Sequence, residues 1–252
     1  MVVLVNKLDS FKANTIDILN QTLNMDLPEF DLIVATMRPS LKERLVNNIN
    51  QQTVKMNVIS IVVQNYSEED IQYLKDTITN CNELFITSED KGAIFGGERY
   101  NIAMTKCKSD IIANFDDDDI YHPEYMRSML YWQLQSQDGM ASKVNIIARD
   151  ERTGLMGWLL TKLRFGDNHV GAGCCMIFTR KVYDRVGGFL NVRQGYDAVF
   201  QREVMKLGYL NKSADPFNFI YTRGRPEGNT WQPGRTGIRH NNIKYHETIL
   251  SI

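Results

Sequence analysis

Residues 111–119 read IIANFDDDD, an apolar run that ends in four consecutive aspartates. A run bounded in this way is typical of a buried strand in a parallel sheet. In open α/β sheets, ligands bind beyond the carboxyl ends of such strands. The sequence therefore predicts that the four acids lie at the edge of the sheet where a ligand binds.

Four adjacent carboxylates repel one another, so a divalent cation or a set of hydrogen-bond donors has to offset the repulsion. Oxygen ligands suit Mg2+ or Mn2+, which proteins often share with the phosphates of a substrate. The alternative is that the acids stabilise the N-terminus of a helix predicted for residues 120–134, where Pro123 lies near the first turn. Capping uses only one or two acids, and both roles can coexist.

Composition favours one α/β domain. The chain has 252 residues, of which 43% are hydrophobic, enough for one sizeable core. Its formal net charge of −1 gives no overall attraction to nucleic acid. Nucleic acid is therefore not favoured as a partner, although a local basic patch could still bind one.

The cysteines and the apolar segments bear on the cellular compartment. Cys107 and Cys174 have apolar surroundings in the sequence and are expected to be buried free thiols, which favours a reducing compartment. No apolar segment approaches the length of a membrane span. We expect no membrane span and a cytoplasmic protein.

Strands and helices alternate through the first half of the chain. Strands are expected at 31–36, 58–63, 83–88 and 111–115, with helices between them at 41–52, after 67 and at 98–107. This alternation with short loops predicts a mostly parallel sheet with helices on both faces. The second half is mixed: a hairpin at 143–161 turning at 152–154, a strand and helix within 171–189 closed by Gly187 and Gly188, and a helix at 194–209.

Four segments in this order resemble motifs of the GT-A glycosyltransferases, closest to the family 2 type that uses nucleotide sugars. They are DLIVATMRPS for the first-strand motif, NFDDDD for the D-x-D-D motif, GAGCCMIFTRKVYDRVGGF for the small-residue strand and GGF motif, and GYDAVFQREVMKLGY for the E-D helix motif. The resemblance covers about residues 30–231. It implies a single GT-A domain over 1–252, with a peripheral helical extension (1–29), a Rossmann-like nucleotide-sugar half (30–120), an acceptor half (121–222) and a flexible basic segment (223–252).

The resemblance also assigns the donor site. Asp118 matches the metal-binding acid, and Asp116 the acid that faces the ribose or the metal. Asp117 and Asp119 are left as neighbours of the metal site or helix caps. The residues expected to contact the nucleotide sugar are Thr36, Arg38, Gln64, Asn65, Arg99, Asp116, Asp117, Arg223 and Arg225. UDP is the expected nucleotide, but relatives often have an acid where Gln64 and Asn65 stand, so the base stays open.

Asp197 matches the general base of an inverting transfer, which takes the proton of the acceptor hydroxyl. The preceding position, commonly Glu in relatives, is Tyr196. The alternative is that Asp197 caps its helix.

Several further residues have two open interpretations. Arg223 and Arg225 either bind the diphosphate or are surface charges. His240 or His246 either completes the metal shell or lies on the surface. Trp158 and Trp231 either stack on sugars or belong to the core. Arg99 and Asn101 either orient the donor or lie on a helix surface.

These expectations predict a metal-dependent, inverting glycosyltransferase that uses Mn2+ or Mg2+. It moves a sugar from a nucleotide diphosphate sugar to a hydroxyl-bearing acceptor such as a glycan or polymer. Two alternatives are kept. One is a nucleotidyltransferase, although residues 34–44 (VATMRPSLKER) lack the Gly-rich phosphate loop of that class. The other is a non-catalytic nucleotide-binding or sugar-binding module, which would tolerate Asp197→Asn.

Overall fold

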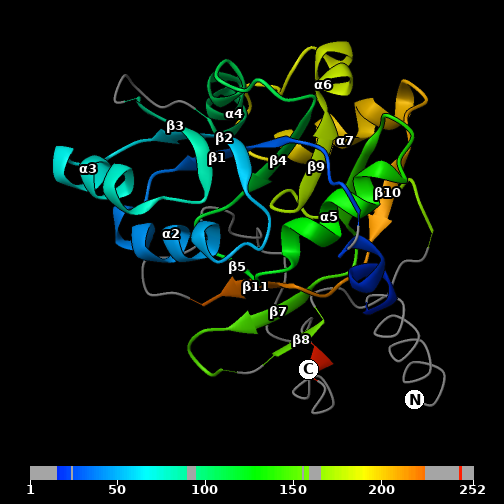
Figure 1. The fold of residues 1–252 in the computed structure, drawn as a ribbon, viewed down its shortest axis with the longest axis horizontal. Helices are drawn as coiled ribbons and strands as arrows, with labels where there is room; N and C mark the ends of the chain where they lie inside the picture. The colour runs from blue at the N-terminus through cyan, green and yellow to red at the C-terminus, as the bar shows by residue number, and fades with distance from the viewer. Residues whose placement is uncertain are drawn as a thin grey trace.

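A seven-stranded sheet of order β10-β6-β9-β4-β1-β2-β3 forms the centre of the protein (Figure 1). The computed structural model describes residues 16–23, 25–89, 95–154, 156–158, 166–224 and 244–245. The strands are β1 (Phe30–Thr36), β2 (Met56–Val63), β3 (Cys81–Ser88), β4 (Ile111–Phe115), β6 (Met140–Lys143), β9 (Met176–Thr179) and β10 (Asn211–Ala214). β9 is antiparallel to its neighbours β4 and β6, and the other pairs are parallel. The predicted mostly parallel α/β sheet is confirmed.

Helices cover both faces of this sheet because successive strand residues point to opposite sides. Val34 belongs to an apolar cluster with residues of α2 (Lys42–Asn50), α3 (Glu68–Thr77) and α5 (Tyr125–Leu134). Its neighbour Ile33 belongs to a second cluster with residues of α4 (Gly96–Met104), α6 (Arg180–Val186) and α7 (Tyr196–Lys206). Figure 1 shows the same division, with α4 and α6 on the side of the sheet opposite α2 and α5.

A second sheet, of order β12-β8-β7-β11-β5, lies beyond α2 and α5 (Figure 1). Its strands are β5 (Ile120–Tyr121), β7 (Ile147–Asp150), β8 (Met156–Trp158), β11 (Phe219–Arg223) and β12 (Lys244–Tyr245). β7 and β8 form the predicted antiparallel hairpin. Phe115 at the end of β4 stacks on Tyr121 of β5, with ring centroids 3.8 Å apart, and this contact joins the two sheets.

The structure corrects the capping interpretation of the aspartates. α5 begins at Tyr125, its N-cap is Glu124, and β5 separates it from Asp119. None of the four acids therefore caps this helix. The predicted end of the helix within 171–189 is confirmed, because α6 ends at Gly187 in the left-handed conformation that glycine adopts readily.

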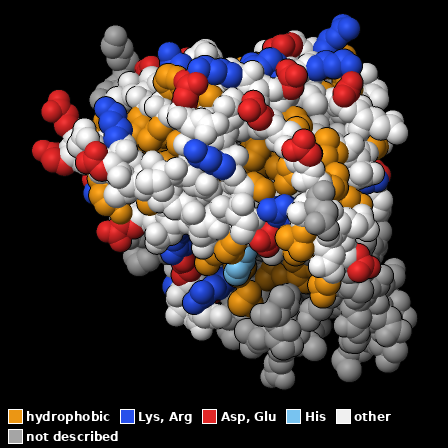
Figure 2. All heavy atoms as spheres, viewed as in Figure 1, with side chains coloured by type: hydrophobic (Ala, Val, Ile, Leu, Met, Phe, Trp, Pro, Cys, Tyr) orange, Lys and Arg blue, Asp and Glu red, His pale blue; other side chains and the backbone are white. Residues whose placement is uncertain are grey.

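The remaining general expectations have mixed outcomes. All four cysteines are free; Cys174 is buried as predicted, whereas Cys107 is only half-buried. None of the helices in the described ranges combines the length and apolar character of a membrane span. Figure 2 shows acidic and basic side chains interspersed on the face in view, as the near-zero net charge suggests.

Candidate functional site

Three adjacent strands end at the same edge of the central sheet. β1 lies between β2 and β4, with Thr36 opposite Val63 and Val34 opposite Phe115. The segments that follow these strands therefore meet, although they are distant in sequence. This places the predicted residues Thr36, Gln64 and Asp116 along one edge, where the carboxyl ends of parallel strands bind ligands.

Arg38 binds two of the four aspartates. Its guanidinium donates to both carboxylate oxygens of Asp117 and, at 2.8 Å, to Oδ2 of Asp118. The Thr36 hydroxyl also donates to Asp117, which is 1% exposed. Burial raises the pKa of Asp117, and the charge and hydrogen bonds of Arg38 oppose that rise. Thr36, Arg38, Asp117 and Asp118 are thus brought together, in a cluster held by one guanidinium.

Asp116 lies in a different network. Its Oδ1 accepts a hydrogen bond of 2.9 Å from the hydroxyl of Tyr100, which in turn accepts one of 3.0 Å from the amide of Asn114. The same amide donates to the carbonyl of Gly173 at 2.8 Å. Burial, followed by the charges of Asp118 and Asp117, raises the pKa of Asp116 to about 7. Asp116 is therefore easily protonated unless a cation stabilises its charge.

Asp119 points into the interior and is held by β11. Its Oδ1 accepts a hydrogen bond of 2.8 Å from the backbone N–H of Thr222. Its Oδ2 is buried and has no hydrogen-bond partner among the described residues. Burial and the charge of Asp118 raise the pKa of this carboxyl, whereas the charge of Arg223 lowers it. An orphaned carboxylate oxygen at this depth is unfavourable unless a ligand binds it.

A group of possible metal ligands forms around this oxygen. Asp116, Asp119 and Cys174 each offer a ligand atom, and these atoms lie within 4.8 Å of one another. These donors fit a divalent cation. Asp116 was predicted as a ligand, whereas Asp119 and Cys174 were not. Asp118, the other predicted ligand, is bound to Arg38, and its metal role stays a prediction.

Asp197 lies across from this group, in the first turn of α7. The N-cap is Gly195 and has no side-chain cap hydrogen bond, so Asp197 does not cap the helix. The backbone N–H groups of Asp197 and Ala198 lower the pKa of its carboxyl. A Cβ built on Gly173 would lie 1.9 Å from Oδ2 of Asp197. Only glycine leaves room for this carboxylate beside the segment that precedes β9. Burial raises the pKa of Asp197.

Two arginines flank the aspartates. Arg99 is 8% exposed and donates to Oε1 of Gln64, so these two predicted donor-site residues are in contact. Arg223 lies over the ring of Tyr221, 3.2 Å from its centroid, and burial lowers the pKa of its guanidinium while Asp119 and Asp118 oppose that shift. Arg223 is therefore close enough to interact with the acidic segment, the four aspartates at 116–119.

Other candidates are placed elsewhere. Asn65 is an exposed residue of the turn after β2, with a φ of 61°. The side chain of Asn101 forms hydrogen bonds with the backbone of Phe189 and with the hydroxyl of Tyr183, so it connects α4 to the segment after α6. Arg225, Trp231, His240, His246 and the side chain of Trp158 lie outside the described residues.

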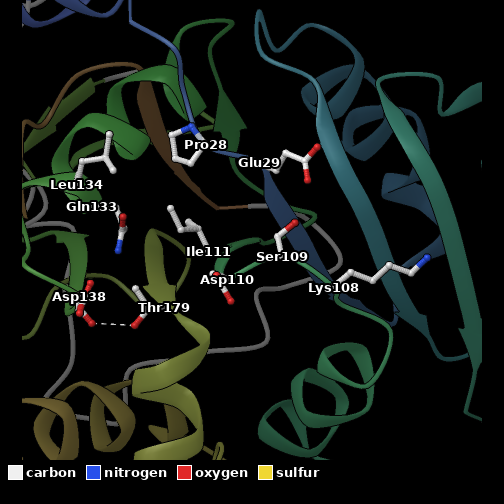
Figure 3. Close-up of a pocket in the computed structure, with 10 residues that line it drawn as sticks. All are labelled: Pro28, Glu29, Lys108, Ser109, Asp110, Ile111, Gln133, Leu134, Asp138 and Thr179. Atoms are coloured by element: carbon white, nitrogen blue, oxygen red, sulfur yellow. Dashed lines mark hydrogen bonds between the residues drawn. The ribbon is translucent and has the colours of Figure 1, made fainter.

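A pocket of about 620 Å³ lies at the opposite edge of the sheet (Figure 3). Glu29 precedes β1 and Ile111 begins β4, so both mark the amino ends of these strands. Figure 3 shows Gln133 and Thr179 on its other side. Because the aspartates follow the carboxyl ends of the strands, this pocket is separate from the candidate site.

Comparison with known proteins identifies the fold. No protein-family model and no curated protein sequence matches the chain. S. aureus TarS 1-349 in complex with UDP-GlcNAc aligns with a TM-score of 0.58 and 12% identity, over 80% of this chain and 60% of that one. The mannosyltransferase PcManGT from Pyrobaculum calidifontis, in complex with GDP-Man and Mn2+, aligns with a TM-score of 0.57 and 15% identity, over 86% of this chain and 68% of that one. The chain has a GT-A-type glycosyltransferase fold.

The match spans only 60% of the length of TarS 1-349, and at these identities it establishes the fold alone. Within the GT-A fold, the residues that sequence reasoning missed are Tyr100, Asn114 and Cys174; Asp119 was placed in the acidic motif, but its separate role was left open. One signal was available for Asn114, since it is a lone amide in an otherwise apolar strand and buried amides need partners. No sequence signal indicated Cys174.

Proposed function

We propose that this protein is a metal-dependent, inverting glycosyltransferase that transfers a sugar from a nucleotide diphosphate sugar, with UDP as the expected nucleotide, to an acceptor hydroxyl. One observation carries the proposal. Asp197 packs against Gly173, and Asp116 is connected to the carbonyl of Gly173 through the side chains of Tyr100 and Asn114, at the ligand-binding edge of a GT-A fold. An acid for the donor cation and a base for the acceptor are the two groups that this reaction requires.

The donor side is built from the ends of β1, β2 and β4. Arg38 holds Asp117 and Asp118 in place, while Gln64 and Arg99 face the same edge. Asp116 would hold the cation, with Asp118 in the ligand set implied by the resemblance, or with Asp119 and Cys174 in the group that the structure forms. A bound divalent ion would supply Lewis-acid stabilisation of the leaving diphosphate.

On the acceptor side, Asp197 acts as the general base. Its carboxylate takes the proton from the acceptor hydroxyl as the oxygen forms a bond to the anomeric carbon. The bond from that carbon to the diphosphate breaks on the opposite face, and the diphosphate leaves with the electron pair. The backbone N–H groups of Ala198 and Asp197 favour the ionised form of this carboxyl, which is the form that accepts the proton. Arg223, and Arg225 beyond it in sequence, would stabilise the departing diphosphate.

Related structures support a nucleotide-sugar donor without fixing the base. TarS was crystallised with UDP-GlcNAc and PcManGT with GDP-Man. The side chain of Gln64 carries both an acceptor oxygen, which is bonded to Arg99, and amide donors, and such a group can pair with more than one base edge. A panel of UDP-sugars and GDP-sugars is therefore the appropriate first assay.

The test measures nucleoside diphosphate release from this panel, with Mn2+ and with EDTA, in wild type, Asp118→Ala and Asp197→Asn. Asp76→Asn, on the exposed end of α3, serves as the matched control. The proposal requires release by wild type and by the control, and loss in Asp197→Asn. Full activity in both site variants would refute it.

Pyrophosphate release from a nucleoside triphosphate and a sugar 1-phosphate would indicate a nucleotidyltransferase. Sugar-nucleotide binding without turnover would indicate a binding module.

A further inference from the structure

The positive side chains near the aspartates are unevenly distributed. The ion pairs that described residues form with the acidic segment go from Arg38 to Asp117 and Asp118. Asp116 accepts only a neutral hydroxyl donor, and Asp119 only a backbone N–H, among the bonds seen here. Oδ2 of Asp119 has no partner among the described residues and is fully buried. Arg223 is the described cation near this second pair, because its charge lowers the pKa of Asp119. The buried Oδ2 of Asp119 nevertheless lacks a hydrogen-bond donor among the described residues, which points to a ligand at this oxygen.

Cys174 completes the group for a reason that lies in the sheet register. β4 and β9 are antiparallel, with Ile111 opposite Thr179 and Ala113 opposite Ile177. Cys174 lies in the turn just before β9, and the chain therefore enters this strand beside the end of β4, which Asp116 follows. The hydroxyl of Tyr121 connects the two, because it accepts from the N–H of Asp116 at 2.9 Å and donates to the carbonyl of Cys174 at 2.8 Å. The thiol is thus fixed beside the carboxylate.

The spacing of the donors suits a metal ion. The ligand atoms of Asp116, Asp119 and Cys174 lie within 4.8 Å of one another. Metal–oxygen distances of about 2.1 Å and metal–sulfur distances of about 2.3 Å place donors about 3.5 Å apart at tetrahedral angles. The group therefore has to contract by up to about 1.3 Å when an ion binds. Asp116 is half-buried, so the group is not sealed from solvent on that side.

We propose that Asp116, Asp119 and the thiolate of Cys174 form the divalent-metal site of this protein, and that the thiolate makes it select Mn2+, Co2+ or Zn2+ over Mg2+. Hard Mg2+ prefers oxygen ligands only, whereas the other ions accept sulfur. Binding breaks the S–H bond of Cys174 and releases its proton to solvent as the metal–sulfur bond forms. The proposal deepens the function proposed above by naming the ligands and the class of metal. Its test measures metal binding directly, without sugar transfer.

The decisive experiment is a Co2+ titration of the whole chain, followed by absorption spectroscopy. A cobalt–thiolate bond gives an intense sulfur-to-metal charge-transfer band in the near ultraviolet, and an all-oxygen site gives none. We expect the band at one equivalent of Co2+ in wild type and in Cys175→Ser, whose Sγ lies 3.8 Å from that of Cys174 but outside the ligand group. We expect its loss in Cys174→Ser, with Co2+ affinity reduced at least about tenfold.

The Co2+ titration of the wild-type protein is by itself sufficient to refute the proposal. A one-to-one Co2+ complex without the charge-transfer band, or no Co2+ binding, contradicts a thiolate ligand even if Cys174→Ser fails to fold. Competition by Mg2+ at concentrations similar to Mn2+ also contradicts it. Binding lost in Asp118→Asn but kept in Cys174→Ser would assign the metal to the ligand set implied by the resemblance. In that case sugar transfer could persist, so failure of this proposal is distinguishable from failure of the proposed function.

Discussion

Replacing Arg38 by methionine tests the charge balance of the acidic segment. The substitution keeps an aliphatic chain but removes the guanidinium that binds Asp117 and Asp118, whose side chains are 1% and 7% exposed. Removing one partner of a fully buried ion pair costs about 3–5 kcal/mol, because the other charge stays in a medium of low dielectric constant. The Arg38 side chain is 18% exposed, so solvent screens part of this cost. We expect the free energy of unfolding to fall by about 3 kcal/mol.

Equilibrium urea unfolding in metal-free buffer with EDTA measures this change. Lys212→Met is the matched control, because Lys212 pairs with Asp167 where the two side chains are 26% and 30% exposed. A surface pair of this kind should cost less than about 1 kcal/mol. Adding Asp117→Asn to Arg38→Met should restore at least about 1 kcal/mol, because it removes the unpaired charge.

The reasoning about Arg38 is refuted if Arg38→Met unfolds within about 0.5 kcal/mol of wild type, the range of ordinary surface substitutions. It is also refuted if the added Asp117→Asn destabilises the variant further. Either result would mean that solvent, rather than Arg38, stabilises the carboxylate of Asp117.

Three further predictions concern the base and the core. Asp197→Asn should lower the transfer rate by about 100-fold or more, while the melting temperature and nucleotide binding stay unchanged. In wild type, kcat/KM should fall as the pH drops through the pKa of Asp197, because only the ionised carboxylate accepts a proton. Burial raises this pKa. Gly173→Ala places a Cβ 1.9 Å from Oδ2 of Asp197, so it should reduce transfer in the same assay without weakening donor binding. Lys143 is fully buried and donates to the carbonyl of Asp215 at 2.6 Å, so Lys143→Met should cost about 3 kcal/mol in urea unfolding, whereas Lys181→Met, at an exposed pair, should change little.

Much of the fold follows from local sequence patterns. The apolar run before Asp116 forms β4, and the alternation of strands and amphipathic helices through residue 115 gives the parallel part of the sheet. The turn at 151–153 produces the predicted β7–β8 hairpin. These features depend on residues close together in the chain. Asp116 was placed at the sheet edge for the same reason, since it directly follows a strand.

The partners of the aspartates could not be predicted, because they come from distant segments. Arg38 turns back onto Asp117, 79 residues away, and the N–H of Thr222 reaches Asp119, 103 residues away. Cys174 lies near Asp116 because it precedes β9, which inserts antiparallel beside β4, and no local pattern specifies that neighbour. Sequence reasoning therefore named the four aspartates, Asp197 and Arg38, but not the contacts that connect them to distant segments.

The acidic segment cannot relieve its repulsion by moving apart, because both sheets hold it. The ring of Phe115 stacks on Tyr121, the carbonyl of Asp118 accepts from Arg44 at 3.0 Å, and the carbonyl of Asp119 accepts from Asn48 at 2.9 Å. Backbone groups fixed in this way keep the four carboxylates close, so positive charge has to offset the repulsion where it arises. Arg38 does so for Asp117 and Asp118. The charge of Arg223 acts in the same sense on Asp119. A divalent ion bound by Asp116 and Asp119, as proposed above, would add to it and would lie where a leaving diphosphate needs it.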